Sequence, residues 1–169
     1  MSQVDLGQEL EHSAAADADG VKRAYMVGHG ADKEYQPQSW MHGSQVYMSR
    51  TKTEVSVEMM RDRQHWEFFA GYQAPGNTPV WKDDVADAAP LFTWENRTGV
   101  VTMTYLPALK KFIMCVSTCT WANGTKSTVG PFDTYFLESS AITGPFKMVS
   151  YLASFGPESF FYYYFLATS

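Results

Sequence analysis

The sequence predicts an all-β fold built from two consecutive four-stranded antiparallel sheets. Short runs of alternating or wholly apolar residues, each about as long as a strand, recur along most of the chain between turn residues. They form two sets with similar spacing, since Tyr25 precedes Tyr47 by nearly as much as Phe112 precedes Tyr135. Aromatic residues, which favour sheets, make up 15% of the chain. Four short strands per repeat are typical of a β-propeller blade, so the sequence predicts an incomplete β-propeller of two blades.

The first predicted blade covers residues 9–70 and follows an N-terminal tail, residues 1–8. Its strands are expected at 9–13, 22–28, 45–50 and 65–69. Asp19-Gly20 has the composition of a tight turn between the first two strands. The connection from the second strand to the third, 28–44, is much longer.

The second predicted blade covers residues 100–155. Its strands are expected at 101–105, 111–117, 133–138 and 146–151. Residues 71–99 are predicted to be an inter-blade linker, mostly irregular because of its prolines and glycines, with one helical turn within 83–89. Residues 160–166 have no charge, no proline and no alternation, and residues 156–169 are interpreted as an aberrant aromatic C-terminal tail of a truncated chain.

Long loops are predicted to gather at one end of this structure. In an up-and-down blade, the connection between the second and third strands emerges at the same end as the link between blades. The connections 28–44 and 118–131 and the linker 71–99 therefore share one face. Functional residues are concentrated on long loops over a rigid scaffold, so this face is the expected site.

Composition excludes several classes of function. The net charge is −5 and no basic run is present, which argues against nucleic acid as a partner. No signal peptide and no 18-residue apolar stretch is found, so no membrane span is predicted. Glycosylation sequons at Asn96 and Asn123 are consistent with a secreted parent protein, but the sequence assigns no cellular compartment. Cys115 and Cys119 are interpreted as free thiols, and no pattern predicts a metal or other cofactor.

The candidate site residues combine carboxylates, histidines and tryptophans. Glu11 and His12, on the expected innermost strand, are the catalytic candidates. The substrate-binding candidates are His29, Trp40, His42, Asp83 and Trp121, and Trp81, Asp84 and Glu95 lie on the same predicted face. Aromatic rings stack on sugars, and paired carboxylates perform acid and base chemistry on glycosidic bonds. The alternative is that these residues are structural, as strand ends, loop plugs and helix-terminal charges.

Several motifs resemble a domain-of-unknown-function family (number 4185). They are Glu11-His12-Ser13, the turn at Asp19-Gly20, Gly28-His29-Gly30, Ser39-Trp40, Trp66 to Gly71, Trp81 to Asp84, Thr104 to Phe112 and Thr143 to Phe146. The resemblance covers residues 9 to about 158. It implies a fold like that of five-bladed β-propeller glycoside hydrolases and a carbohydrate-related pocket, without supplying a reaction.

The predicted function is therefore that of a carbohydrate-binding or glycoside-hydrolase-like propeller fragment, with a glycan as its partner. The alternatives are a non-catalytic lectin-like or protein-interaction scaffold and an inactive truncated fragment. Two blades leave flanking sheet faces without neighbours, so self-association through the open faces is also expected.

Overall fold

The computed structural model describes residues 1–30, 43–119, 121–122, 125–126 and 132–155. The strands are β1 (Ser2–Asp5), β2 (Tyr25–Gly30), β3 (Gly43–Thr51), β4 (Trp66–Gln73), β5 (Thr78–Lys82), β6 (Phe92–Thr98), β7 (Val100–Leu106), β8 (Lys111–Cys119), β9 (Trp121–Ala122), β10 (Thr125–Lys126), β11 (Phe132–Ser139) and β12 (Lys147–Phe155). The helices are short: η1 (Gln8–Leu10), α1 (Ser13–Ala16), α2 (Val57–Met60), η3 (Arg63–His65) and η4 (Val85–Asp87). The prediction of an all-β fold is confirmed.

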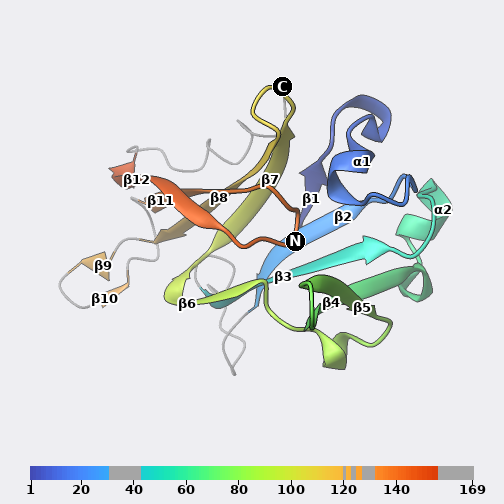
Figure 1. Cartoon of the computed structure of the whole chain (residues 1–169). Coiled ribbons are helices and arrows are strands. Elements are labelled where there is room, and N and C mark those ends of the chain that lie inside the picture. The colour runs from blue at the N-terminus through green and yellow to red at the C-terminus, as the bar shows by residue number, and fades with distance from the viewer. Residues whose placement is uncertain (31–42, 120, 123–124, 127–131, 156–169) are drawn as a thin grey trace.

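One 10-stranded sheet contains nearly all of these strands, in the order β12-β11-β8-β7-β1-β2-β3-β4-β5, with β6 paired to β3 beside this path (Figure 1). It consists of two antiparallel meanders, β2-β3-β4-β5 and β7-β8-β11-β12. β1 joins them, because it pairs antiparallel with β2 and parallel with β7. The path is open, with β5 at one end and β12 at the other.

The N-terminus differs most from the prediction. Residues 1–8 were expected to be a tail but contain β1, whose Val4 is fully buried, as is Leu6 just after it. The strand predicted at 9–13 is wrong, because this segment lies in η1 and α1 and the turn between them. A physical reason is that β1 and β3 already occupy the two edges of β2, so a strand at 9–13 cannot pair with β2.

The other predicted strands are confirmed, but the prediction of a mostly irregular linker at 71–99 is wrong. This segment contains β5 and β6. β4 pairs with residues 49–51 of β3 and then diverges, so residues 43–46 keep a free edge that β6 occupies. The helical turn predicted within 83–89 is confirmed as η4.

The two long connections that follow β2 and β8 leave the sheet at the same end of its strands. β2 and β8 run in the same direction, since β1 is antiparallel to β2 and parallel to β7, and β7 is antiparallel to β8. The connections that follow β2 and β8 therefore start from the same end of the strands, as predicted. Most of their residues, 31–42 and 120–131, lie outside the described part of the chain, except for the backbone of the small β9-β10 hairpin.

Alternation along the strands builds one core between the two meanders. In β8, Phe112, Met114 and Val116 are fully buried, while the intervening side chains are half-buried. They belong to the same buried cluster as Val27 and Met48 of the other meander. Each such side chain contributes roughly 1.5–3 kcal/mol by leaving water, so the shared core stabilises the packing of the two meanders.

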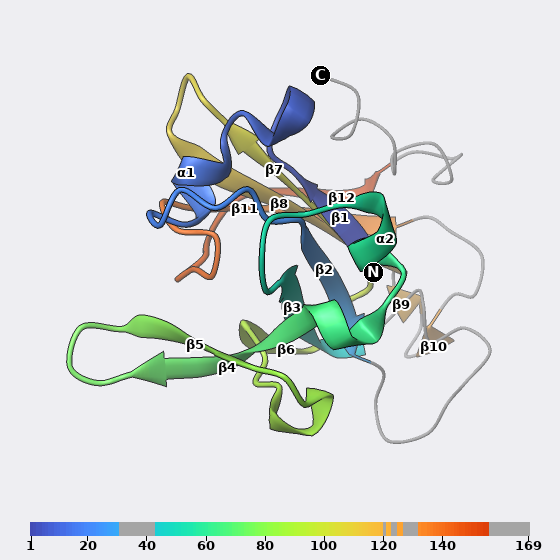
Figure 2. The same cartoon turned by 90° about the vertical axis from the view of Figure 1, so that its right-hand side faces the viewer.

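The β4-β5 hairpin bends away from the rest of the first meander (Figure 2). The register between the two strands shifts between Phe69 and Tyr72, and Gly71 has a φ of 98°, a left-handed conformation that glycine adopts without strain. The irregularity redirects the hairpin toward the loop after β11, where the Tyr72 phenol reaches the carbonyl of Thr143 at 2.8 Å.

Candidate functional site

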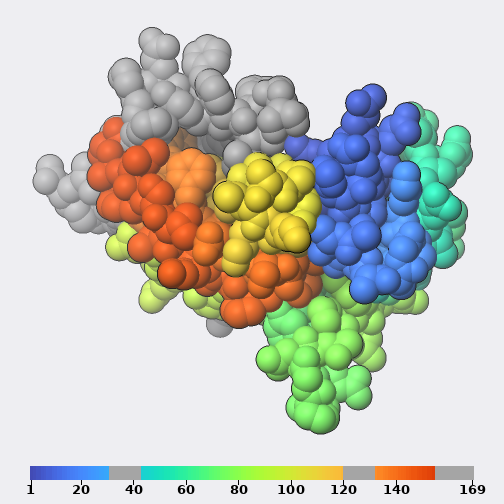
Figure 3. All heavy atoms as spheres, turned by 45° about the horizontal axis from the view of Figure 1, so that its top comes forward, coloured from blue at the N-terminus to red at the C-terminus, as the bar shows by residue number. Residues whose placement is uncertain are grey.

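A cavity of about 470 Å³ opens at the end of β2 and β3 that is opposite the long connections. Three segments enclose it: residues 15–19 before β2, residues 140–143 after β11, and residues 78–81 of β5, together with Arg50 at the end of β3. Figure 3 shows these three segments, in blue, orange and green, meeting on one face of the molecule. The volume lies within the range of about 300–1,000 Å³ that is usual for ligand sites.

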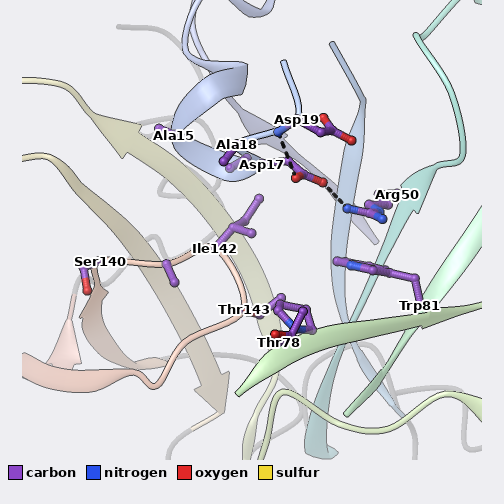
Figure 4. Close-up of a pocket in the computed structure, with 13 residues that line it drawn as sticks. Ala15, Asp17, Ala18, Asp19, Arg50, Thr78, Trp81, Ser140, Ile142 and Thr143 are labelled. Atoms are coloured by element: carbon purple, nitrogen blue, oxygen red, sulfur yellow. Dashed lines mark hydrogen bonds and ion pairs between the residues drawn. The ribbon is translucent and has the colours of Figure 1, made fainter. Parts of the chain in front are cut away.

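A charged wall of the cavity centres on Asp17, which bridges two arginines. Figure 4 shows its pairing with one of them, Arg50. Its carboxylate pairs with the guanidinium of Arg50 and lies 3.3 Å from that of Arg23. Arg50 also donates to Glu67 at 2.7 Å, and Arg23 pairs with Asp19 at 2.7 Å. Each guanidinium is mostly buried, so the carboxylates supply the compensating charge that burial requires.

Trp81 forms the aromatic part of the cavity. The guanidinium of Arg50 stacks on its ring, 4.2 Å from the centroid. Edge contacts with Tyr25 and Phe69, at 6.2 and 5.9 Å between centroids, hold the indole from behind. No described residue accepts a hydrogen bond from the indole N–H, and the ring extends toward the cavity (Figure 4). The site therefore offers an aromatic surface with an available donor.

The opposite wall is a tight loop after β11. Ile142 and Thr143 are almost fully buried, and Ala141 accepts from the N–H of Gly144 to close the turn. The hydrogen bond from Tyr72 fixes this loop against the β4-β5 hairpin. This tethered loop thus encloses the cavity together with β5 and the end of β3.

The environment shifts the pKa values of the charged wall in different directions. Burial alone would lower the pKa of Arg50, but its hydrogen bond and charge interaction with Glu67 outweigh burial and raise it. A hydrogen bond from the backbone N–H of Val21, followed by the contribution of Arg23, lowers the pKa of Asp19. Both groups are held in their charged forms at neutral pH.

Tyr25 lies behind this wall, cross-strand from Arg50. Its phenol oxygen is buried without a hydrogen-bond partner among the described residues. Burial raises the pKa of this phenol, and the nearby positive charge of Arg50 opposes the rise. The Arg50 guanidinium and the phenol oxygen do not reach hydrogen-bond geometry in the structure.

A second cavity of about 430 Å³ lies beside the first. It is lined by residues 19–23 before β2 and 52–54 after β3, and Asp19 lines both cavities. Lys22, Arg23 and Lys52 make it richer in cationic side chains than the first cavity.

The catalytic candidates lie outside both cavities. Glu11 and His12 are between η1 and α1, with 3.5 Å between His12 Nε2 and Glu11 Oε1. The His12 ring packs against Tyr105, and Glu11 is 60% exposed. Their placement on an innermost strand is wrong for the reason given above. Gly7 allows the pair to fold back, since a Cβ there would lie 2.8 Å from Glu11 Oε1.

The substrate-binding candidates within the described residues do not lie together in one site either. His29 lies near the C-terminal end of β2, whereas Glu11 and the cavities lie beyond its N-terminal end. Asp83 is 76% exposed after β5 and pairs with Lys52 at 3.0 Å. Trp40 and His42 lie outside the described residues, and Trp121 begins β9 with its side chain outside that description.

Among the predicted face residues, Trp81 lines the first cavity. The residues around it that sequence reasoning missed are mainly Asp17 and Arg50. An arginine inside an apolar strand is a signal, because a half-buried cation needs a carboxylate. The partner is 33 residues away in the chain, so no local pattern identifies it.

Within the described part of the chain, no three histidine, cysteine, aspartate or glutamate side chains are grouped as a metal site would require. The described helices are all too short or too polar to cross a bilayer. No protein-family model matches the chain, and no curated protein matches it at a significant level. The resemblance to the domain family number 4185 therefore stays a prediction.

Proposed function

We propose that the chain binds a carbohydrate in the cavity beside Trp81. The observation that carries this proposal is the combination, in one cavity of ligand size, of an indole with an available N–H and a wall of oriented polar groups. Sugars present both an apolar ring face and many hydroxyls. An aromatic ring meets the first need, and the carboxylates of Asp17 and Asp19 with the hydroxyls of Thr78 and Ser140 meet the second.

Binding without hydrolysis fits the charged wall better than catalysis does. A glycosidase acid must keep its proton near neutral pH, which requires a raised carboxyl pKa. The pKa of Asp19 is lowered, and Asp17 is shared between two guanidinium groups. Both carboxylates are suited to accept hydrogen bonds from hydroxyls. A lectin-like module is therefore our preferred form of the carbohydrate proposal.

We also propose that the two meanders are successive blades of a β-propeller, as the family resemblance implies. In support, each meander is a four-stranded antiparallel unit, and both contribute to one core. On this proposal β1 is an additional strand that ties neighbouring blades together through its pairing with β2 and β7. The parent protein would then carry further blades around the same axis.

A glycan array followed by calorimetry on the best ligand tests the carbohydrate proposal. Trp81→Phe keeps an aromatic ring but removes the indole N–H and part of the ring area. Loss of one hydrogen bond and some contact is worth roughly 1–1.5 kcal/mol, so we expect about tenfold weaker binding. Trp66→Phe is the matched control, because Trp66 donates to the carbonyl of Met60 and lines neither cavity.

Two results would overturn the proposal. One is the absence of binding to any glycan by the folded chain. The other is equal binding by the wild type and Trp81→Phe, with thermal unfolding showing that both are folded. Release of reducing sugar from a bound glycan would retain the cavity as the site and favour the hydrolase form instead.

A second candidate is association of two copies through β12. This strand ends the sheet path, and among described residues no strand pairs with its outer edge. Met148, Val149 and Tyr151 expose apolar surface there. An antiparallel pairing of β12 with its symmetry copy satisfies the free backbone groups in both chains.

Sedimentation velocity over a range of concentrations tests this second candidate. Val149→Lys places a charge on the edge and is expected to shift the chain toward monomer. Val85→Lys is the control, because Val85 and Val149 are both 49% exposed and Val85 lies in η4. A wild-type chain that stays monomeric at all concentrations would exclude the association.

A further inference from the structure

The two cavities adjoin along a ridge of ion-paired side chains. Asp17 and Asp19 line the first cavity, and Arg23 lines the second together with Asp19. The Arg23 guanidinium lies 2.7 Å from Asp19 and 3.3 Å from Asp17. The boundary between the cavities is therefore a row of charged, planar groups, with Asp19 exposed along it.

The ridge is held in place from both sides. Asp19 accepts a hydrogen bond at 2.9 Å from the N–H of Val21, which closes the turn around Gly20. Gly20 has a φ of 78°, a conformation that this turn requires and that glycine supplies. Arg23 reaches in the other direction to the carbonyl of Lys52 at 3.4 Å. These contacts connect the ridge to residues that line both cavities.

The cavities differ in character. The first has the Trp81 ring and the buried Ile142, whereas the described residues that line the second include lysines and no aromatic side chain. Lys52 is paired with Asp83, but the ammonium of Lys22 contacts only an uncharged group among the described residues, the carbonyl of Glu9 at 3.2 Å. Lys22 can therefore turn its remaining N–H donors toward hydroxyls in the second cavity.

We infer that the two cavities are adjoining subsites of one site, which takes an oligosaccharide of at least two rings. This inference rests on the proposed carbohydrate function and adds the length of the ligand. One ring lies against Trp81, the next lies beside Lys22, and the linkage between them crosses the ridge at Asp19. Each cavity is of ligand size by itself, so a single ring fills only half of the site.

Calorimetry with cello-, xylo- and chito-oligosaccharides of one to four rings tests the inference. In at least one series we expect binding to tighten tenfold or more between one and two rings and then change little. Lys22→Ala is expected to remove most of the difference in affinity between one and two rings. Lys147→Ala is the control, since Lys147 is exposed on β12 and lines neither cavity.

The results separate the two levels of the proposal. Binding that depends on Trp81 but not on ring number, or a Lys22→Ala chain with the full gain, would overturn the two-subsite inference and leave the carbohydrate function standing. Failure of all three series and of the glycan array would overturn both. Thermal unfolding of Lys22→Ala must match the wild type, as expected for an exposed side chain.

Discussion

The phenol of Tyr72 donates a hydrogen bond of 2.8 Å to the main-chain carbonyl of Thr143, although 71 residues separate them in the chain. Tyr72 belongs to the first meander, and Thr143 follows the third strand of the second. They hold together two walls of the cavity, β5 and the loop after β11, and β5 and β11 do not pair with each other in the sheet. This bond and the core beneath it therefore connect the two walls.

Tyr72→Phe is expected to destabilise the chain by about 1–2 kcal/mol, because the nearly buried carbonyl of Thr143 loses its donor. Urea unfolding measures the loss, and hydrogen exchange should quicken in β5. Tyr47→Phe is the control, since its hydrogen bond to Gln45 stays within β3. Equal exchange in β5 for both variants would show that Tyr72 does not hold the hairpin.

Asp17→Asn is expected to cost roughly 1–3 kcal/mol, between the values for exposed and buried ion pairs. The carboxylate is 23% exposed and compensates two mostly buried guanidinium groups. Each of them keeps one other carboxylate, Glu67 for Arg50 and Asp19 for Arg23. Thermal or urea unfolding provides the measurement. Asp87→Asn, at an exposed position in η4, should change stability little, and similar losses in both variants would contradict the bridging role.

Tyr25→Phe is expected to leave stability unchanged or raise it by about 1 kcal/mol, because it removes a buried hydroxyl that has no described partner and keeps the ring. Tyr25→Ala should instead cost about 3–5 kcal/mol by opening a cavity in the core. Unfolding curves of the three chains give the comparison. A clear loss of stability in Tyr25→Phe would mean that the hydroxyl has a partner in solution.

Local alternation was enough to predict most of the sheet, but not strands such as β1 and β6. β8 and β11 carry their pattern in the sequence itself, through side chains such as Phe112 and Tyr135. β1 does not, because Ser2–Asp5 is short and becomes a strand only between β2 and β7. β6 likewise depends on a free edge of β3. Such strands are set by tertiary neighbours, which a local pattern does not contain.

The site was predictable only in its residue types. Aromatic and acidic side chains do line the cavity, and Trp81 was on the predicted face. The cavity itself lies at the other end of the strands, because the bend after Phe69 carries the β4-β5 hairpin to the loop after β11. Neither that bend nor the pairing of Asp17 with Arg50 has a local signature.

The thiol of Cys115 is expected to make the free energy of unfolding depend on pH in the alkaline range. Burial raises the pKa of its thiol from 9.0 to about 11, with a smaller opposing contribution from Ser117. The folded state therefore keeps a thiol proton that the unfolded state releases above pH 9. The contribution of the buried thiol to the free energy of unfolding is intact below pH 9 and is lost as the pH rises toward 11. The expected loss is about 2 kcal/mol by pH 11. Urea unfolding between pH 8 and 11 measures it. The serine side chain of Cys115→Ser does not titrate in this range. The free energy of unfolding of this variant should therefore fall by about 2 kcal/mol less than that of the wild type between pH 8 and 11. Parallel curves for the two chains would show that the thiol is not buried as described.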